Sequence, residues 1–354
     1  MRIKVIFIIP SLRSGGAERV MSFLAQNLNK EQFNPILLVV GHNENVAYDV
    51  KDTNVFFLKK DKVSNAIPKI IRFFYDQKPQ IVISAIAHLN MAMALISPLF
   101  PNTKFVGRET IVASKSTKQK SRSLVSTILF KLKPKLLDCI VCQSKDMRED
   151  LLNNYNYPAH KLHIINNPVT SKFRLKDSFN NNSKFELITV GRLTKQKGYS
   201  RILIALSKIN VDFHYTIIGN GPLYEVVMND IHKYKLADKV KHIPYTNKVE
   251  TFLSKSDLFL SGSYVEGFPN AILESCAVGT PVLAFAAEGG IDEIIKPGIN
   301  GEIAFNDKDF LEKLKFCIAK KWEPSVIRES VTKLYSEDII LFKYQELFLK
   351  LKNS

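Results

Sequence analysis

Short apolar runs alternate with helix-like stretches along most of this 354-residue chain, and no other feature limits its fold as much. Such alternation is typical of α/β domains built on a parallel sheet. The first half has candidate strands at 5–9, 36–40, 55–58, 81–86, 104–108, 139–143 and 162–165. After a break at 166–169 the pattern restarts, with candidate strands at 185–190, 213–218, 240–243, 257–260 and 281–285.

The restart predicts two domains. We expect a first Rossmann-like domain over 1–170, a polar linker over 171–184 and a second Rossmann-like domain over 185–337. A last helix, 338–354, is expected to pack back on the first domain. Two α/β halves of this kind place a ligand cleft between them, at the carboxyl ends of their strands.

Composition is that of an ordinary soluble protein, with 45% apolar and 24% charged residues. No apolar run reaches the roughly 18 residues that span a bilayer, and the apolar start is too short for a signal peptide. The four cysteines form no framework, which predicts a reducing cytoplasm. Cys139 and Cys142 sit three apart in a predicted strand, so they should face opposite sides and share neither metal nor disulfide.

The net charge of +16 is concentrated in the first half, where residues 1–170 hold 24 Lys and Arg against 12 Asp and Glu. This balance favours an anionic partner: phospholipid headgroups, a lipid diphosphate or nucleic acid. Within 113–136 no acidic residue occurs, and apolar residues recur at helical spacing. We predict a basic amphipathic helix on an anionic membrane surface. The basic residues assigned to acceptor or membrane contact are Lys115, Lys118, Lys120, Arg122, Lys131 and Lys133.

One stretch, 261–295, has the residues of a nucleotide-sugar pocket. Glu266 and Glu274 stand eight positions apart, and a helix is expected to open between them, near Pro269 and Asn270. The free N–H groups at a helix start, beside Gly267, suit an anionic ligand. One carboxylate just before the helix and a second about one turn inside it can accept hydrogen bonds from sugar hydroxyls.

Cations follow the first strand of the second half. Arg192 and Lys197 lie on a glycine-bracketed loop, where they are placed to neutralise a diphosphate. Gly219 follows the next strand and could line the same cleft. In the first half, Gly15 and Gly16 occupy a strand-to-helix turn that a phosphate could approach, and His88 follows another strand. The spacing of the glycines is not that of a dinucleotide fingerprint.

The pattern Asp307-Lys308-Asp309 matches a metal-binding motif of some transferases, but it precedes a helix, where aspartates serve as caps. We therefore predict no metal site and no cofactor.

Taken together, six stretches resemble the retaining glycosyltransferases of family 4, which have the GT-B fold. They occur in the family's order over nearly the whole chain, at 11–20, 166–169, 191–198, 217–222, 266–275 and 288–295. The resemblance implies two Rossmann-like domains that face each other across a deep interdomain cleft. It also implies a metal-independent hexosyltransferase whose substrate, not cofactor, is a nucleotide-sugar.

By this resemblance, Arg192 and Lys197 bind the donor diphosphate and Glu274 the ribose. Glu266, Gly267, Phe268, Pro269 and Asn270 hold the transferred hexose. Gly15 and Gly16 approach the donor phosphates from the opposite domain. Their positions just after strands, rather than the resemblance, assign Gly219 to the donor site and His88 to the sugar or acceptor site. Catalysis is assigned to Glu266, Arg192, Lys197 and His88, with no covalent nucleophile.

The expected reaction moves a hexose or N-acetylhexosamine, from a donor that we expect to be UDP-linked, to a saccharide acceptor that we expect to be lipid-diphosphate-linked. The family implies a cytoplasmic enzyme at the inner face of the membrane that builds capsule, O-antigen or glycan chains. Two alternatives stay open. A GT-B sugar-nucleotide epimerase would share the donor site, and a basic nucleic-acid-binding protein would leave the paired glutamates unexplained. The sequence predicts that nucleic acid is not a partner.

Overall fold

The computed structural model describes residues 2–13, 15–44, 46–47, 50–115, 133–177 and 184–353. It divides into two compact units. Unit 1 comprises Met1–Pro168 and Asp338–Ser354, and unit 2 comprises Val169–Glu337. Each unit is built on its own parallel sheet, as the alternating pattern predicts.

Unit 1 holds a seven-stranded sheet in the order β3-β2-β1-β4-β5-β6-β7. Its strands are β1 (Ile3–Ile9), β2 (Phe33–Val39), β3 (Asn54–Phe57), β4 (Ile81–Ala85), β5 (Lys104–Arg108), β6 (Cys139–Cys142) and β7 (Leu162–Ile164). Side chains alternate between its two faces: Val5 and Phe7 pack in one core cluster and Ile6 in the other. Both faces are covered, which explains why the strands read as continuous apolar runs.

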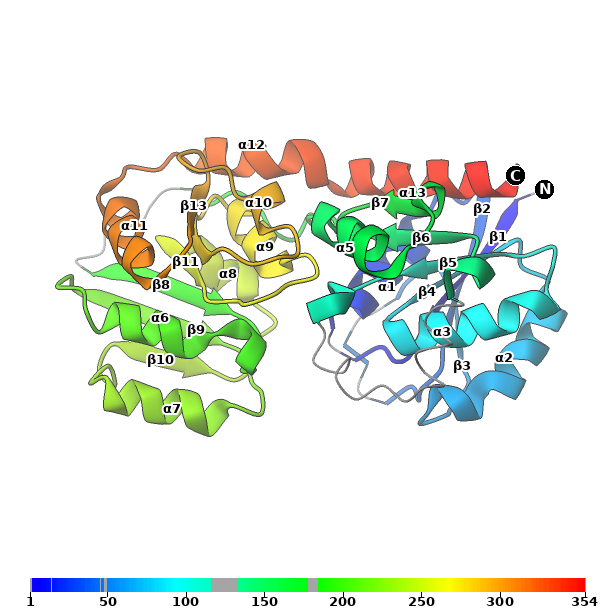
Figure 1. Ribbon diagram of the computed structural model, residues 1–354, viewed down its shortest axis with the longest axis horizontal. Helices are drawn as coiled ribbons and strands as arrows, with labels where there is room; N and C mark the ends of the chain where they lie inside the picture. Colours follow the sequence, from blue (N-terminus) through cyan, green and yellow to red (C-terminus); the bar gives the residue numbers. More distant parts are fainter. Residues whose placement is uncertain are drawn as a thin grey trace. The chain divides into compact units, whose positions relative to one another are not determined.

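The helices of unit 1 lie on both faces of this sheet (Figure 1). They are α1 (Gly16–Asn27), α2 (Val63–Gln77), α3 (Ala87–Ile96), α5 (Lys145–Tyr155) and α13 (Glu337–Lys352), with short 3-10 turns η1 (Ser97–Leu99), η2 (Ala113–Lys115) and η4 (Ala159–Lys161). The C-terminal α13 buries Tyr344 and Phe348 in the same cluster as β1 and β2, and the Phe348 ring meets Phe7 and Phe33 edge-on.

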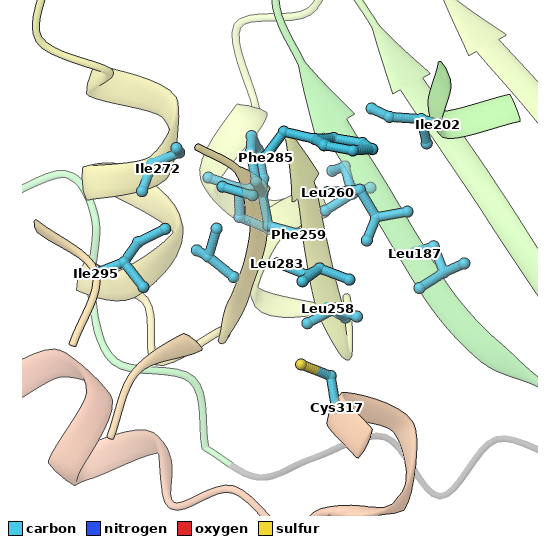
Figure 2. Close-up of a cluster of buried hydrophobic side chains, with 14 of the residues drawn as sticks. Leu187, Ile202, Leu258, Phe259, Leu260, Ile272, Leu283, Phe285, Ile295 and Cys317 are labelled. Atoms are coloured by element: carbon cyan, nitrogen blue, oxygen red, sulfur yellow. The ribbon is translucent and has the colours of Figure 1, made fainter. Parts of the chain in front are cut away.

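Unit 2 holds a six-stranded parallel sheet in the order β10-β9-β8-β11-β12-β13. Its strands are β8 (Phe185–Val190), β9 (Phe213–Ile218), β10 (Val240–Ile243), β11 (Leu258–Ser261), β12 (Val282–Phe285) and β13 (Gly301–Ala304). Its helical elements are η5 (Lys195–Lys197), α6 (Tyr199–Leu206), α7 (Tyr224–Lys233), α8 (Val249–Ser254), α9 (Asn270–Ala277), α10 (Ile291–Ile294), α11 (Asp307–Ala319) and α12 (Pro324–Tyr335). Figure 2 shows part of its core, in which Leu258, Phe259 and Leu283 belong to the same buried cluster as Cys317 of α11.

Two details differ from the expected organisation. Strand β13 does not fall in any predicted strand, because its four residues include Gly301 and Glu302 and give no apolar run. The described part of the predicted linker packs within unit 2: Phe173 is buried, and Lys176 Nζ donates to the carbonyl of Ser256 and the hydroxyl of Thr280. Residues 178–183 lie outside the described ranges.

The two cysteines of β6 pack in clusters on opposite faces of the sheet, as their spacing predicts. Both are buried free thiols, and burial raises the pKa of Cys139 to about 12. Within the described ranges, none of the helices combines the length and hydrophobicity that crossing a bilayer requires.

The strand order creates one switch point in each sheet. In unit 1 the chain leaves β1 for β2 on one side and later returns to place β4 on the other, and in unit 2 strands β8, β9 and β11 repeat this arrangement. Ligands of open α/β sheets bind outside the carboxyl ends of the strands at such points.

Candidate functional site

An ion pair occupies the switch point of unit 2. Lys197 follows β8 and Glu266 follows β11, and Lys197 Nζ lies 2.7 Å from Glu266 Oε1. The carboxylate side chain is 8% exposed and the lysine side chain 26% exposed. The two residues that the sequence places on separate loops are therefore in direct contact, at the edge of the sheet where a ligand is expected.

The two oxygens of the Glu266 carboxylate have different surroundings. Oε1 accepts both from Lys197 Nζ and from Ser263 Oγ, at 2.7 and 2.5 Å. For Oε2 the described residues provide no hydrogen-bond donor. Glu266 and Lys197 line a small cavity together with Thr189, Ser263 and Pro269. The arrangement fixes the carboxylate through one oxygen and leaves the other able to accept a hydrogen bond from a ligand.

The contact depends on a close approach of two loop backbones. A Cβ on Gly198 would lie 2.0 Å from the carbonyl oxygen of Gly262, and a Cβ on Gly262 would lie 2.4 Å from that of Gly198. Gly198 also has a φ of +59°, which favours glycine. Any side chain at these two positions would separate the Lys197 loop from the Glu266 loop.

Arg192 lies on the same loop as Lys197, next to the end of β8. Its side chain is exposed, and no residue of the described ranges pairs with it. Gly219, which follows β9, packs beneath this loop: a Cβ there would lie 2.0 Å from the carbonyl oxygen of Gly191. Tyr199 supports the loop from below, since its hydroxyl donates to the same carbonyl at 2.7 Å and burial raises its pKa. The loop thus presents Arg192 to solvent on a fixed backbone.

Helix α9 opens beside the cavity. Pro269 precedes its first residue, Asn270, and both Gly267 and Pro269 are buried. Phe268 is buried against Tyr335, with ring centroids 5.5 Å apart, so its side chain packs in the core. Glu274 lies within the helix and is only 7% exposed. The sequence predicts a helix that opens near Pro269 and Asn270, and α9 begins at Asn270.

Three predicted residues of unit 1 share the carboxyl edge of its sheet. Gly15 and Gly16 follow β1 and start α1, while His88 is exposed in the first turn of α3, after β4. The Glu18 carboxylate folds over Gly15, where a Cβ would lie 2.1 Å from Oε2. Burial raises the pKa of Glu18, although Arg108 opposes that shift.

A buried polar network in the same unit was not predicted. The amide of Asn90 donates to the Arg108 carbonyl and to Glu109 Oε1, and Gln143 Nε2 donates to the Glu109 carbonyl at 2.6 Å. Arg108 is completely buried and donates to Tyr344 and Asn167. The residues that surround Arg108 are far apart in the sequence, so no local sequence pattern predicts its burial.

Lys133 belongs to this network, which corrects one expectation. Its side chain is 1% exposed and forms an ion pair with Glu109. Lys133 therefore cannot present its ammonium to a membrane surface, because the group is enclosed in unit 1. Lys115 is exposed at the end of η2. The other basic residues predicted to contact acceptor or membrane, Lys118, Lys120, Arg122 and Lys131, lie outside the described residues.

The aspartates at 307 and 309 act at a helix start. Asn306 caps α11 by accepting from the Asp309 amide, and Asp309 Oδ2 accepts from the Phe305 amide and pairs with Lys313. The arrangement is related to a capping box, but Asp309 accepts from the amide of the residue before the cap rather than from that of the cap itself. The capping interpretation is thus confirmed, with Asn306 rather than an aspartate as the cap residue.

Comparisons with known proteins identify the family. The model of the family described as "Glycosyltransferase Family 4" matches residues 14–173, and that of "Glycosyl transferases group 1" matches residues 171–333. This chain belongs to the family 4 glycosyltransferases. The Lys197 and Glu266 loops both lie in the group 1 match, so the ion pair is part of a glycosyltransferase domain.

Among related family 4 glycosyltransferases, one from Campylobacter jejuni is 28% identical over 82% of this chain and 83% of its own length. It is an N-acetylgalactosamine-N,N'-diacetylbacillosaminyl-diphospho-undecaprenol 4-alpha-N-acetylgalactosaminyltransferase. An amylovoran biosynthesis glycosyltransferase from Erwinia amylovora is 24% identical over 83% of this chain and 84% of its own length.

Solved structures show the same fold. A lipopolysaccharide outer core galactosyltransferase superposes with a TM-score of 0.80 at 17% identity, covering 98% of this chain and 99% of the other. The Anabaena protein HepE, solved with UDP and glucose, superposes with a TM-score of 0.81 at 14% identity, covering 99% and 100%. The GT-B fold class is thereby confirmed.

Sequence reasoning missed two residues of this candidate site. Ser263 donates to Glu266, and its position three residues before that glutamate was a usable signal. Arg201 donates to the carbonyls of Gly262 and Ser263. It lies on α6, outside the loop motif that the sequence singled out, and only the folded structure brings it to the Glu266 loop.

Proposed function

We propose that this glycosyltransferase moves a hexose or N-acetylhexosamine from a UDP-sugar to a saccharide acceptor with retention of anomeric configuration. The observation that carries the proposal is the Glu266 carboxylate at the switch point of unit 2. It is held through Oε1 by Lys197 and Ser263, which leaves Oε2 to accept from a sugar hydroxyl. The exposed Arg192 on the neighbouring loop supplies a cation for the diphosphate.

The predicted donor-binding residues of unit 2 bind different parts of the donor. Arg192 and Lys197 hold the diphosphate, and Glu274 accepts from the ribose hydroxyls. Glu266 and the backbone of 267–270 hold the hexose. The N–H groups at the start of α9 add a partial positive charge where the donor's phosphates and hydroxyls converge. Gly219 acts indirectly: because it has no side chain, the Arg192 loop can pack closely against it.

The reaction breaks the bond between the anomeric carbon and the diphosphate oxygen. Negative charge develops on the leaving group, and the cations of Arg192 and Lys197 stabilise it. The acceptor hydroxyl then attacks the anomeric carbon from the face that the diphosphate leaves. Its proton passes to the departing phosphate, which yields the nucleoside diphosphate and the new glycoside. The step needs no covalent enzyme intermediate and no metal ion.

Relatives support the choice of substrates. The Campylobacter jejuni relative bears the name of a transferase that acts on a diphospho-undecaprenol saccharide, and HepE was solved with UDP and glucose. We therefore propose a UDP-linked donor, a lipid-diphosphate-linked saccharide acceptor at the inner face of the cell membrane, and a product in bacterial surface polysaccharide.

The test is a screen of UDP- and GDP-sugars without acceptor. Purified protein is incubated with each donor, with and without EDTA, and slow hydrolysis and thermal shift are measured. We expect one UDP-sugar to be hydrolysed in the presence of EDTA. Hydrolysis should be lost in Arg192→Ala and Glu274→Ala and kept in Glu186→Ala, which removes a glutamate at the start of β8, paired with His214.

Three outcomes would contradict parts of the proposal. Absence of stabilisation and of hydrolysis with every donor would overturn the donor site. Loss of hydrolysis with EDTA would overturn metal independence. Conversion of a UDP-sugar to its epimer without net release of UDP would identify an isomerase instead.

A further inference from the structure

Arg201, in the first turns of α6, binds the loop that ends in Glu266. Its Nε donates to the carbonyl of Gly262 at 2.7 Å, and its Nη2 donates to the carbonyl of Ser263. Its guanidinium lies between two aromatic rings, 4.2 Å from the centroid of Tyr264 and 3.8 Å from that of Phe285. The planar fork thus meets two consecutive carbonyls while both of its faces are covered.

The remaining groups of the loop are also held, which makes its geometry specific. The Tyr264 amide donates to the Gln196 carbonyl, and Gln196 Nε2 donates back to the Val265 carbonyl, each at 2.8 Å. The Glu266 amide donates to the Glu288 carbonyl at 2.8 Å. Arg201 binds the carbonyls of residues 262 and 263. Ser263 is also the residue whose hydroxyl donates to Glu266.

We propose that Arg201 is a positioning residue for Glu266. Through the carbonyls of Gly262 and Ser263 it sets the direction of Ser263 Oγ, so that this hydroxyl and Lys197 Nζ meet the same carboxylate oxygen. Oε2 then keeps a fixed direction toward the cavity, where the transferred sugar binds. Arg201 itself does not touch the substrate. This inference rests on the proposed function, because it assigns the sugar to Oε2.

The chemistry of the side chain explains why arginine stands here. A lysine would place one ammonium between the rings and could not satisfy two neighbouring carbonyls in one plane. An alanine would leave both carbonyls without their donor and open a gap between Tyr264 and Phe285. Loss of the fork should therefore disturb the Glu266 carboxylate while leaving the Arg192 loop and the diphosphate contacts in place.

Arg328 offers a matched control within unit 2. Its Nη1 donates to two backbone carbonyls, those of Phe173 and Ala277. It lies on α12, and none of its hydrogen bonds to the described residues reaches the Glu266 loop. Arg328→Ala removes a similar set of hydrogen bonds and should lower thermal stability without a selective effect on the sugar donor. It separates positioning from general support of the fold.

The experiment compares wild type, Arg201→Ala, Arg201→Lys and Arg328→Ala. Three quantities are measured: the Kd for UDP, kcat and KM for hydrolysis of the UDP-sugar found in the screen, and amide hydrogen exchange at Tyr264 and Glu266. In Arg201→Ala we expect kcat to fall by about 10²-fold, the effect of a misplaced catalytic group, while the Kd for UDP changes by less than about twofold. Exchange at both amides should accelerate, and Arg201→Lys should recover only part of the loss.

Equal losses in Arg201→Ala and Arg328→Ala, unchanged exchange at 264 and 266, or parallel weakening of UDP and the UDP-sugar would each overturn the inference. Failure of the proposed function is a different result. There, wild type neither binds UDP nor hydrolyses any donor, while the exchange at 264 and 266 still reports whether Arg201 fixes the loop.

Discussion

The carboxyl edges of the two sheets have the same strand topology and use their charged residues in opposite ways. In unit 1, Arg108, Glu109 and Lys133 are buried: Lys133 pairs with Glu109, and the Asn90 amide donates to the Arg108 carbonyl. In unit 2, Arg192 is exposed, and Glu266 is held through Oε1 only, with no donor to Oε2 among the described residues. Topology selects the edge where polar residues gather. Whether these side chains are enclosed or exposed decides whether they stabilise the fold or can bind a ligand.

The difference follows from desolvation. A charge that is enclosed must be compensated by the protein, since an unpaired buried charge costs several kcal/mol. Unit 1 meets this requirement with an ion pair and amide hydrogen bonds. A charge at a ligand site remains partly hydrated until the ligand replaces the water. The comparison therefore predicts stability effects from substitutions of the buried charges at the unit 1 edge, and activity effects from substitutions of Glu266 and Arg192 at the unit 2 edge.

The largest effect is expected for Lys133→Met. Removal of the ammonium leaves the Glu109 carboxylate buried without its cation, and breaking such a pair costs about 3–5 kcal/mol. Urea unfolding should report this loss of free energy of unfolding. The double variant Lys133→Met/Glu109→Gln serves as control and should recover most of the stability, because no charge then stays uncompensated. A Lys133→Met protein as stable as wild type would place the lysine in a functional rather than a structural role.

Glu266→Gln tests the opposite edge. The amide keeps the shape of the side chain but removes the charge that pairs with Lys197 and the strong acceptor offered to the sugar. We expect turnover to fall by about 10²–10³-fold, as when one preorganised hydrogen-bonding group is lost. Steady-state hydrolysis of the donor measures it. Glu186→Gln, at the other end of β8, should keep wild-type turnover, and similar losses in both variants would remove the distinction between the edges.

Local pattern was enough to find most of the described strands and to single out the two residues of the ion pair. Of the described strands, β13 alone was missed, and Lys197 and Glu266 were both named from loops 69 residues apart. Such residues are visible in sequence because they follow apolar strands directly and lie beside glycines. Their direct contact was not predicted, since it depends on the mutual approach of Gly198 and Gly262.

Buried polar residues were much harder to predict. Lys133 was grouped with surface lysines because a lysine in a basic segment normally faces water. Its partner Glu109 lies 24 residues away, and the network also draws on Tyr344, 236 residues from Arg108. No periodicity links such positions. The role of Arg201 was not predicted for the same reason, since its carbonyl partners are 61 and 62 residues away in the sequence.

Lys176 shows whether a buried cation in unit 2 behaves like those of unit 1. Burial lowers its pKa from 10.5 to about 8, although Asp257 opposes the shift. Because the folded pKa is depressed, the unfolded chain takes up a proton first as the pH falls from 10.5 to 8. The free energy of unfolding should therefore rise between pH 8 and 10.5, by about 2–3 kcal/mol at most. Urea unfolding across this range measures it.

In Lys176→Met this part of the pH dependence should disappear, while donor hydrolysis stays at the wild-type rate. The difference between the two proteins at each pH cancels the titration of other groups. A wild-type slope that persists in Lys176→Met would assign it to another residue. Loss of hydrolysis would show that a buried cation of unit 2 takes part in the site, which would weaken the comparison.

The smallest effect is expected for Arg192→Lys, which keeps the charge and removes the planar fork. If Arg192 binds the diphosphate through two hydrogen bonds, the loss of one charge-assisted bond is worth about 1.5 kcal/mol, or about tenfold in kcat/KM. Lys195→Arg is the matched control, because Lys195 is exposed on the same loop. It should leave kcat/KM unchanged. Equal rates in wild type and Arg192→Lys would mean that the loop contributes only its positive charge, and the exposed edge of unit 2 would then recognise its donor through Glu266 and α9.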